Sequence, residues 1–276
     1  MAPNNDASQA KQPEIKVYWL NDSRAERAVW LLEELGLTYS VEIFHRNSET
    51  NLAPPELERI HPLGKAPVVT VTPVSANGPA APIVLAESAF IAEYLVEHFG
   101  AASHLAPPRY HPGITAGTPA AVGSETESWM RYRYFLHYVE GSLMSPLTLA
   151  LVLGIFKSPK VPFFVRPVTG FVADKVLWGF VYPNVFRHLA FLESQLATAP
   201  DGGPYLCGAH LTAADIMLGF PLSRARGAFA DLDMGGGRGK VRDSFPKLWA
   251  YVDRLMAEPG LKRSLARMEE AEAAKK

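Results

Sequence analysis

Residues 64–69 read Gly-Lys-Ala-Pro-Val-Val, and residues 86–89 read Ala-Glu-Ser-Ala. The first stretch leads through a proline into a β-branched strand pattern, and the second places a Glu-Ser pair where an extended run gives way to a helical pattern. A strand entry and a helix start of this kind suit an extended, negatively charged peptide, because both offer backbone N–H groups. The two stretches therefore predict an α/β domain that binds such a peptide.

The segments around these stretches alternate between strand and helix patterns. An apolar, β-branched and aromatic run ends near Asn21-Asp22-Ser23, and helical spacing then continues until Gly36. The predicted elements are a strand at 15–20, a helix at 25–35, a strand at 39–44, a short helix at 54–60, strands at 66–71 and 83–85, and a helix at 88–99. This βαβαββα order is that of a thioredoxin-like α/β domain with a mixed sheet, expected over residues 14–101.

The rest of the chain has helical spacing. Residues 102–123 are dense in Pro and Gly without periodicity, which is typical of a linker between domains. Residues 124–266 predict an all-helical C-terminal domain, and residues 1–13 and 267–276 are expected to be flexible tails. The alternative for the charged stretch 262–276 is that it continues as a solvated helix.

Composition limits the number of domains and the kinds of partner. A chain of 276 residues with 48% hydrophobic residues is long enough for two domains. Its 27 basic and 28 acidic residues form no basic field for nucleic acid. The single cysteine, Cys207, cannot form an intramolecular disulfide and has no neighbouring thiol or histidine cluster for a structural metal. We expect no nucleic-acid partner, no metal and a cytoplasmic location.

Two apolar stretches are relevant to whether the protein associates with a membrane. Residues 143–156 are interrupted by polar residues and fall short of the roughly 20 residues that a bilayer-spanning helix needs, so no transmembrane segment is predicted. Residues 161–186 are rich in Phe, Val, Trp and Tyr, with Arg166, Lys175 and Arg187 among or beside them. This segment suits the core of a helical domain, an apolar ligand pocket or a face on a membrane surface. Peripheral association with an intracellular membrane therefore stays open.

Several motifs together resemble a known family. They are residues 17–24 (Val-Tyr-Trp-Leu-Asn-Asp-Ser-Arg), 28–35, 54–57, 61–67, 85–88, 205–208 and 211–216. Jointly they resemble cytosolic-type glutathione transferases, and more narrowly the yeast-like fungal branch with a serine active site, over residues 14–265. The resemblance implies detoxifying conjugation of glutathione, as co-substrate rather than permanent cofactor, to a hydrophobic electrophile. It also implies a homodimer, with glutathione peroxidase side activity as a further expectation.

The resemblance implies a catalytic role for Ser23, which precedes an Arg-Ala-Val run as the serine of serine-type transferases does. A cysteine-type thiol titrates near 8.5, so the enzyme must stabilise the thiolate, and a hydroxyl at a helix start can donate to sulfur. The alternative role for Ser23 is ordinary N-capping. Tyr18 is out of register with the tyrosine-type pattern, and Arg24 is either a source of positive potential or a solvated side chain.

The resemblance also implies the glutathione contacts. The backbone N–H and C=O of Ala66 pair with the cysteinyl unit, and Pro67 is cis in the family, whereas the sequence alone favours a trans proline. Glu87 and Ser88 hold the γ-glutamyl end at a helix N-terminus, with simple capping by Ser88 as the alternative. Lys65 is expected to pair with the glycine carboxylate.

Two further residues, His45 and Arg46, are candidates to share the charge on that carboxylate, or else are exposed loop residues. The expected electrophile pocket includes Trp129, Tyr132 and Phe164, although aromatic residues at helical spacing also suit a core. Residues 153–171 depart from compact family members near the expected electrophile entrance.

Three residues of the C-terminal half have expected structural roles. Thr212 and Asp215 are expected to form a capping box, and Cys207 is expected to be a buried small hydrophobe. Two alternatives to an enzyme stay open: a glutathione-binding regulatory or scaffold protein with little transferase activity, and a membrane-surface ligand carrier.

Overall fold

The computed structural model describes residues 12–75, 78 and 80–275, which form two compact units. The first unit contains the described residues up to Ala92 together with those from Arg263 onward, and the second contains Glu93–Lys262. The division falls inside a helix, α2 (Ser88–Phe99), and not in the expected linker at 102–123. The reason is that the second half of α2 has its polar partner in the second unit, where Glu93 forms an ion pair with Arg133.

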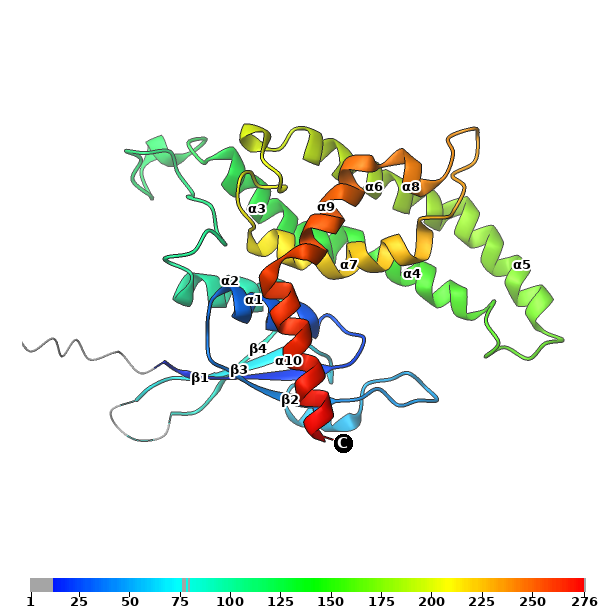
Figure 1. The fold of residues 1–276 in the computed structure, drawn as a ribbon, viewed down its shortest axis with the longest axis horizontal. Helices are drawn as coiled ribbons and strands as arrows, with labels where there is room; N and C mark the ends of the chain where they lie inside the picture. The colour runs from blue at the N-terminus through cyan, green and yellow to red at the C-terminus, as the bar shows by residue number, and fades with distance from the viewer. Residues whose placement is uncertain (1–11, 76–77, 79, 276) are drawn as a thin grey trace, which may run out of the picture. The chain divides into compact units, whose positions relative to one another are not determined.

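The first unit is built on a four-stranded mixed sheet (Figure 1). Its strands are β1 (Glu14–Leu20), β2 (Ser40–Phe44), β3 (Val68–Thr72) and β4 (Ile83–Ala86), in the order β2-β1-β3-β4. β1 runs parallel to β2 and antiparallel to β3, and β4 is antiparallel to β3. With α1 (Ala25–Glu34), a 3₁₀ turn η1 (Pro55–Arg59) and α2, this confirms the thioredoxin-like domain.

The sequence pattern explains why these elements form. Ile15 and Val17 of β1 are buried, as alternation along a half-buried strand requires, and Leu20 at the end of the strand is buried on the opposite face. The apolar face of α1, which includes Val29 and Leu32, is buried as well. Gly36 ends this helix, because its φ of +64° is a left-handed conformation that glycine adopts without steric cost.

The last helix, α10 (Pro259–Lys275), belongs mostly to the first unit. Arg263 Nε lies 3.3 Å from Glu33 Oε2, and the Arg267 guanidinium donates to the Tyr39 carbonyl at 3.0 Å and covers its ring. Met268 is buried there too. The expected flexible tail at 267–276 is therefore wrong for residues 267–275, because contacts distant in sequence hold them as a helix; residue 276 and residues 1–11 lie outside the described part.

The second unit is all-helical, as expected, and its elements follow in chain order. They are η2 (Pro119–Ala121), α3 (Glu127–Tyr138), η3 (Val139–Leu143), α4 (Met144–Ile155), α5 (Arg166–Val176), η4 (Leu177–Val181), α6 (Tyr182–Ala197), η5 (Pro200–Gly202), α7 (Ala213–Phe229), α8 (Val241–Ser244) and α9 (Pro246–Ala257). α7 is central: it contacts α3, α4 and α9, and eleven of its residues are buried.

α3, η3 and α4 join into one 29-residue helical stretch, Glu127–Ile155, because η3 is a π-helical turn inside it. By length and composition alone this stretch is able to cross a membrane, with a mean hydropathy of 1.4 over its most apolar window, 22% of which is buried. The apolar run 143–156 alone is too short for a span, and the stretch reaches that length only because α3 precedes the run without a break. Such a property is weak evidence of a span, since core helices of soluble proteins share it.

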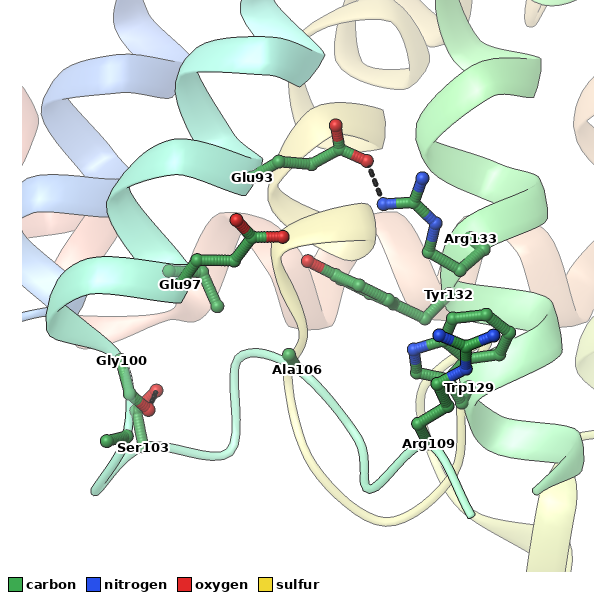
Figure 2. A pocket seen from close by; sticks show the side chains of 11 residues that line it. Glu93, Glu97, Gly100, Ser103, Ala106, Arg109, Trp129, Tyr132 and Arg133 are labelled. Atoms are coloured by element: carbon green, nitrogen blue, oxygen red, sulfur yellow. Dashed lines mark hydrogen bonds and ion pairs between the residues drawn. The ribbon is translucent and has the colours of Figure 1, made fainter. Parts of the chain in front are cut away.

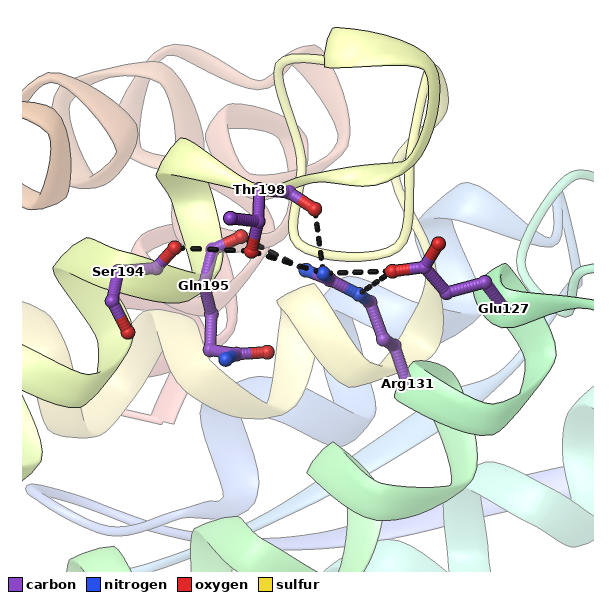
Figure 3. Close-up of polar contacts among 5 residues, drawn as sticks. All are labelled: Glu127, Arg131, Ser194, Gln195 and Thr198. Carbon is purple, nitrogen blue, oxygen red and sulfur yellow. Dashed lines mark hydrogen bonds and ion pairs between the residues drawn. The ribbon is translucent and has the colours of Figure 1, made fainter.

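Arg131 ties the first helix of this unit to the end of α6 (Figure 3). Its guanidinium donates to the Gln195 carbonyl at 2.9 Å and the Thr198 carbonyl at 2.5 Å, and it pairs with Glu127 at 2.8 Å. Carbonyls in the last turn of a helix lack intrahelical partners, and a cation there is favourable. Arg131 therefore satisfies the C-terminus of α6.

The start of α7 contains the predicted capping box between Thr212 and Asp215. Asp215 Oδ2 accepts from the Thr212 N–H at 2.8 Å and from the Thr212 hydroxyl at 2.6 Å. Its Oδ1 accepts from the Tyr251 hydroxyl at 2.7 Å and the Leu206 N–H at 3.2 Å. The fully buried carboxylate thus joins α7, α9 and the preceding loop, a structural role that extends beyond the cap.

Candidate functional site

A small pocket of about 140 Å³ in the first unit brings together five of the predicted glutathione contacts. Its lining consists of Arg24, His61, Leu63, Lys65, Ala66, Pro67, Ala86, Glu87 and Ser88. Lys65, Ala66 and Pro67 come from the entry to β3, and Glu87 and Ser88 from the junction of β4 with α2. Because β3 and β4 pair with Val68 opposite Ala86, the sheet itself sets these two segments side by side.

The backbone at this pocket has two uncommon conformations. The Ala66–Pro67 peptide bond is cis, as the family resemblance implied and against the trans expectation from the sequence alone. Glu87 has a φ of +72°, which costs a non-glycine residue free energy and persists where the surroundings impose it. Strained residues of this kind concentrate at binding sites, so the Glu87 backbone is an independent indication that this pocket is functional.

The helix start at the pocket is suited to a carboxylate. Ser88 is the first residue of α2 and is buried, and the first turn of that helix contains no acidic residue. The first amides of a helix lack intrahelical acceptors and carry the positive end of its dipole. Arg24 and Lys65 add two cations to the lining, while Glu87 supplies one exposed carboxylate for an ammonium group. This charge pattern fits a peptide with carboxylates and one free amine.

Ser23 lies next to this pocket in sequence but is not part of its lining, where Arg24 is found instead. Ser23 is 7% exposed; its hydroxyl donates to the Leu20 carbonyl at 2.7 Å and accepts from the Ala25 N–H at 3.1 Å. The second contact satisfies the Ala25 amide at the start of α1, although the N-cap residue of this helix is Arg24 and not Ser23. In the first contact the hydroxyl proton points to the Leu20 carbonyl, at the C-terminal end of β1.

His45 and Arg46 lie outside the lining of the pocket. The Arg46 backbone N–H donates to Asn21 Oδ1 at 2.7 Å, and its guanidinium donates to the carbonyls of Asn21, Asp22 and Asn51. Arg46 therefore fastens the loop after β2 to the loop after β1. His45 lines a different surface hollow of the first unit, beside Lys275.

A larger cavity of about 650 Å³ lies within the second unit (Figure 2). Trp129 and Tyr132 line it, whereas Phe164, the third candidate for an electrophile pocket, lies in the α4–α5 connection with 71% of its surface exposed. The Arg109 guanidinium covers the Trp129 ring at 4.6 Å, and Glu93 points at Arg133.

The lining of this cavity is more charged than expected for an apolar electrophile pocket, since two glutamates and two arginines contribute to it. Burial, and then the nearby Glu93 carboxylate, raise the pKa of the Tyr132 hydroxyl well above its usual value, so this phenol stays protonated. The three aromatic candidates therefore do not form one apolar wall.

The sequence reasoning missed three lining residues, His61, Leu63 and Ala86, as site residues. They belong to the motifs at 61–67 and 85–88, and the position of His61 and Leu63 six and four residues before Pro67 was the available signal. Over the part of the chain that the structure describes, no group of three or more His, Cys, Asp or Glu side chains is arranged to hold a metal ion.

Comparison with known proteins gives matches over both units. The model of the glutathione S-transferase N-terminal domain matches residues 23–98, and that of the glutathione S-transferase C-terminal domain matches residues 180–254. Glutathione S-transferase 1 of Saccharomyces cerevisiae is 33% identical over 213 residues, which are 77% of this chain and 81% of that protein. Glutathione S-transferase 3 of Schizosaccharomyces pombe is 27% identical, over 77% of this chain and 74% of that protein.

Among solved structures, a glutathione transferase homolog from Lodderomyces elongisporus with two GSH per subunit has a similar fold. Its TM-score is 0.63 at 19% identity, covering 91% of this chain and 97% of that chain. At this identity the likeness concerns the fold, which is the same succession of a thioredoxin-like domain and a helical domain.

Proposed function

Since this chain belongs to the glutathione S-transferase family, we propose that it binds glutathione in the pocket at Ala66, Glu87 and Ser88 and transfers it to hydrophobic electrophiles. The observation that carries the proposal is the convergence in one pocket of Ala66 at the entry to β3, Glu87 with its left-handed backbone and the start of α2 at Ser88. Each of these features suits a different part of the tripeptide.

The size of the pocket limits what it encloses. Sites that enclose a whole drug-sized ligand usually measure roughly 300–1,000 Å³, whereas this pocket measures about 140 Å³. It therefore holds the γ-glutamyl end, with its carboxylate at the Ser88 amide and its ammonium at Glu87. The remaining peptide extends along Ala66 as an added strand, and Lys65 faces the glycine carboxylate.

We assign activation of the thiol to Ser23. Its hydroxyl donates to the Leu20 carbonyl, a neutral hydrogen bond with a net worth of about 1 kcal/mol. A hydrogen bond to an anion is roughly twice as strong, so rotation of the hydroxyl toward a bound thiolate is favourable. Lowering the thiol pKa by about two units requires roughly 2.7 kcal/mol, to which this bond and the positive end of the α1 dipole both contribute.

The test replaces the hydroxyl and follows activity with pH. We expect Ser23→Ala to lower kcat for conjugation of 1-chloro-2,4-dinitrobenzene roughly 10- to 100-fold near neutral pH, with glutathione affinity by calorimetry changed by less than about threefold. The loss should shrink above about pH 8.5, where the thiol ionises without assistance. This recovery distinguishes a role in ionisation from a structural role.

Ser158→Ala is the matched control, because Ser158 makes the same pair of backbone contacts, donating to Ile155 O at 2.8 Å and accepting from Lys160 N at 3.3 Å. Unchanged turnover in Ser23→Ala removes Ser23 from the mechanism. Glutathione binding by the wild-type chain without turnover of any electrophile supports the regulatory or scaffold alternative, and absence of binding at millimolar glutathione contradicts the site itself.

A further inference from the structure

The exposed apolar side chains of the described residues are concentrated in one part of the second unit. Of 23 large hydrophobic residues that are exposed, 13 lie in the segment 151–180, which we call the α4–α5 tip. They are Leu151, Val152, Ile155, Phe156, Phe163, Phe164, Val165, Val168, Phe171, Val172, Val176, Trp178 and Phe180. Single exposed apolar residues are normal, but a contiguous cluster of this size marks an interaction surface.

α5 within this tip is apolar around most of its circumference. Ala173 is buried, as is Leu177 at the start of η4, whereas Val168, Phe171 and Val172 are exposed on other sides of α5. A helix in a water-facing position normally carries polar residues on its outer face. The outer face of α5 therefore has the composition of a buried face but is exposed among the described residues.

The tip is a preformed hairpin and not a loose loop, because polar contacts join its two arms. Lys157 Nζ lies 2.6 Å from Asp174 Oδ1, and the Thr169 hydroxyl donates to the Phe156 carbonyl at 2.8 Å. The Arg166 guanidinium donates to the Val161 carbonyl at 3.0 Å within the connecting loop. In Figure 1, α4 and α5 converge on the loop that joins them. The aromatic residues of the loop, Phe163 and Phe164, are thus presented on an ordered support.

The α4–α5 tip has a net positive charge. Residues 151–180 contain four basic residues and one acidic residue, a net charge of +3, although the whole chain has a net charge of −1. The acidic residue, Asp174, is neutralised by its ion pair with Lys157. Lys175 lies over the Phe171 ring at 5.4 Å, so its ammonium stands at the edge of the apolar surface. Apolar side chains bordered by Lys and Arg are the composition of segments that lie in the headgroup region of a membrane.

We propose that the α4–α5 tip docks on the surface of an anionic phospholipid bilayer, with its Phe and Val side chains in the acyl boundary and its lysines at the phosphates. The basic charge supplies the complementarity, and each Lys or Arg near such a surface adds about fivefold in affinity, the equivalent of ~1 kcal/mol. Face-to-face pairing of two tips would instead bring two sets of like charges together, which is unfavourable.

Docking on the surface fits the packing better than crossing the bilayer. The other face of α4 contacts α6, α7 and η4 within the same unit, so lipid cannot surround this helix while those contacts hold. A bilayer-spanning helix would require these contacts to separate. The tip therefore enters the membrane only to the depth of its exposed side chains.

The first test measures binding of the full chain to vesicles by flotation. We expect binding to phosphatidylcholine vesicles that contain phosphatidylserine, weaker binding to pure phosphatidylcholine, and release as salt is raised. Phe163→Ser with Phe171→Ser, at positions that are 80% and 64% exposed, should weaken binding at least roughly tenfold. The matched control is Val122→Ser with Leu52→Ser, two exposed apolar positions away from the tip.

The second test removes charge without removing apolar surface. Lys160→Gln with Lys175→Gln should weaken binding to the phosphatidylserine vesicles by about fivefold per lysine and leave binding to pure phosphatidylcholine unchanged. Lys262→Gln, outside the tip, is the control. Glutathione affinity by calorimetry should be unchanged in all these variants, because their positions lie outside the lining of the glutathione pocket, and this separates the test from that of the glutathione site.

Two outcomes would overturn the proposal. One is absence of binding to either vesicle, or binding that the tip variants do not alter. The other is a larger species of the wild-type chain in sedimentation velocity, lost in the Phe163→Ser, Phe171→Ser variant, with no vesicle binding. That result would assign the tip to contact with a second copy of this chain.

Discussion

Cys207 shows how an environment sets the chemistry of one residue. Its side chain is 4% exposed, and burial raises the pKa of its thiol well above the usual value, with the nearby Asp215 carboxylate acting in the same direction. The thiol therefore stays protonated and unreactive. This agrees with the expected role as a small buried hydrophobe, and it separates Cys207 from the thiol chemistry proposed at the glutathione pocket.

The raised pKa of Cys207 predicts a pH dependence of stability. The unfolded thiol ionises above about pH 8.5 while the folded one does not, so the unfolded state releases a proton and the unfolding free energy falls as pH rises. Between about pH 8.5 and 10 the slope should approach 1.4 kcal/mol per pH unit. Urea unfolding of the wild type and of Cys207→Ala at several pH values measures this slope. An equal pH dependence of the unfolding free energy in both proteins would contradict a raised pKa for Cys207.

At the scale of elements, the start of α7 depends on a single carboxylate. Burial raises the pKa of Asp215, and the hydrogen bonds from Thr212, Tyr251 and the Leu206 N–H oppose that effect. The sequence predicted only the capping pair, a contribution of about 1 kcal/mol. The structure adds donors from α9 and from the preceding loop, so loss of the carboxylate affects three segments together.

We expect Asp215→Asn to lower the unfolding free energy by about 3 kcal/mol or more, because an amide group places N–H donors against the donors that the carboxylate accepts from. Thr212→Ala should cost about 1 kcal/mol, since it removes one cap contact. Asp201→Asn, at an exposed turn, is the control and should have little effect. Urea unfolding by circular dichroism measures all three, and a loss no larger for Asp215→Asn than for Thr212→Ala would contradict this account.

At the scale of the whole molecule, β1 and most of α10, the first and last elements of the described residues, belong to the same unit. α10 reaches Glu33 and Tyr39 of the first unit through Arg263 and Arg267, and Lys275 donates to the Ile43 carbonyl of β2. These contacts span more than 200 residues of sequence. The glutathione pocket lies in the unit that they complete.

Deletion of residues 263–276 should therefore destabilise the first unit selectively. We expect faster amide hydrogen exchange in β1, β2 and α1, with exchange in α7 unchanged, because local stability follows the contacts that hold each cooperative unit. Arg267→Ala should produce a smaller effect in the same segments. Equal acceleration in both units, or none in the first, would contradict the role assigned to α10.

The features that the sequence predicted correctly are those that depend on residues close together in the chain. Strand alternation at 15–20, helical spacing after Ser23 and the capping box at Thr212 each lie within about ten residues of sequence, so their physics is visible there. The cis bond at Pro67 and the grouping of Lys65 with Glu87 came from the resemblance. Neither burial nor periodicity of the sequence indicates them, and the grouping of Lys65 with Glu87 depends on how β3 and β4 pair.

By itself the sequence determined the order of elements, the thioredoxin-like and helical domains and the segments that form the pocket, because apolar periodicity dictates which face each element buries. Only the tertiary structure decided that α10 joins the first unit, that Arg24 and His61 line the pocket while Arg46 does not, and that the apolar residues of the α4–α5 tip face outward. The physical reason is that burial and pairing are properties of contacts between distant residues, and an apolar side chain reads the same in sequence whether a neighbouring helix covers it or not.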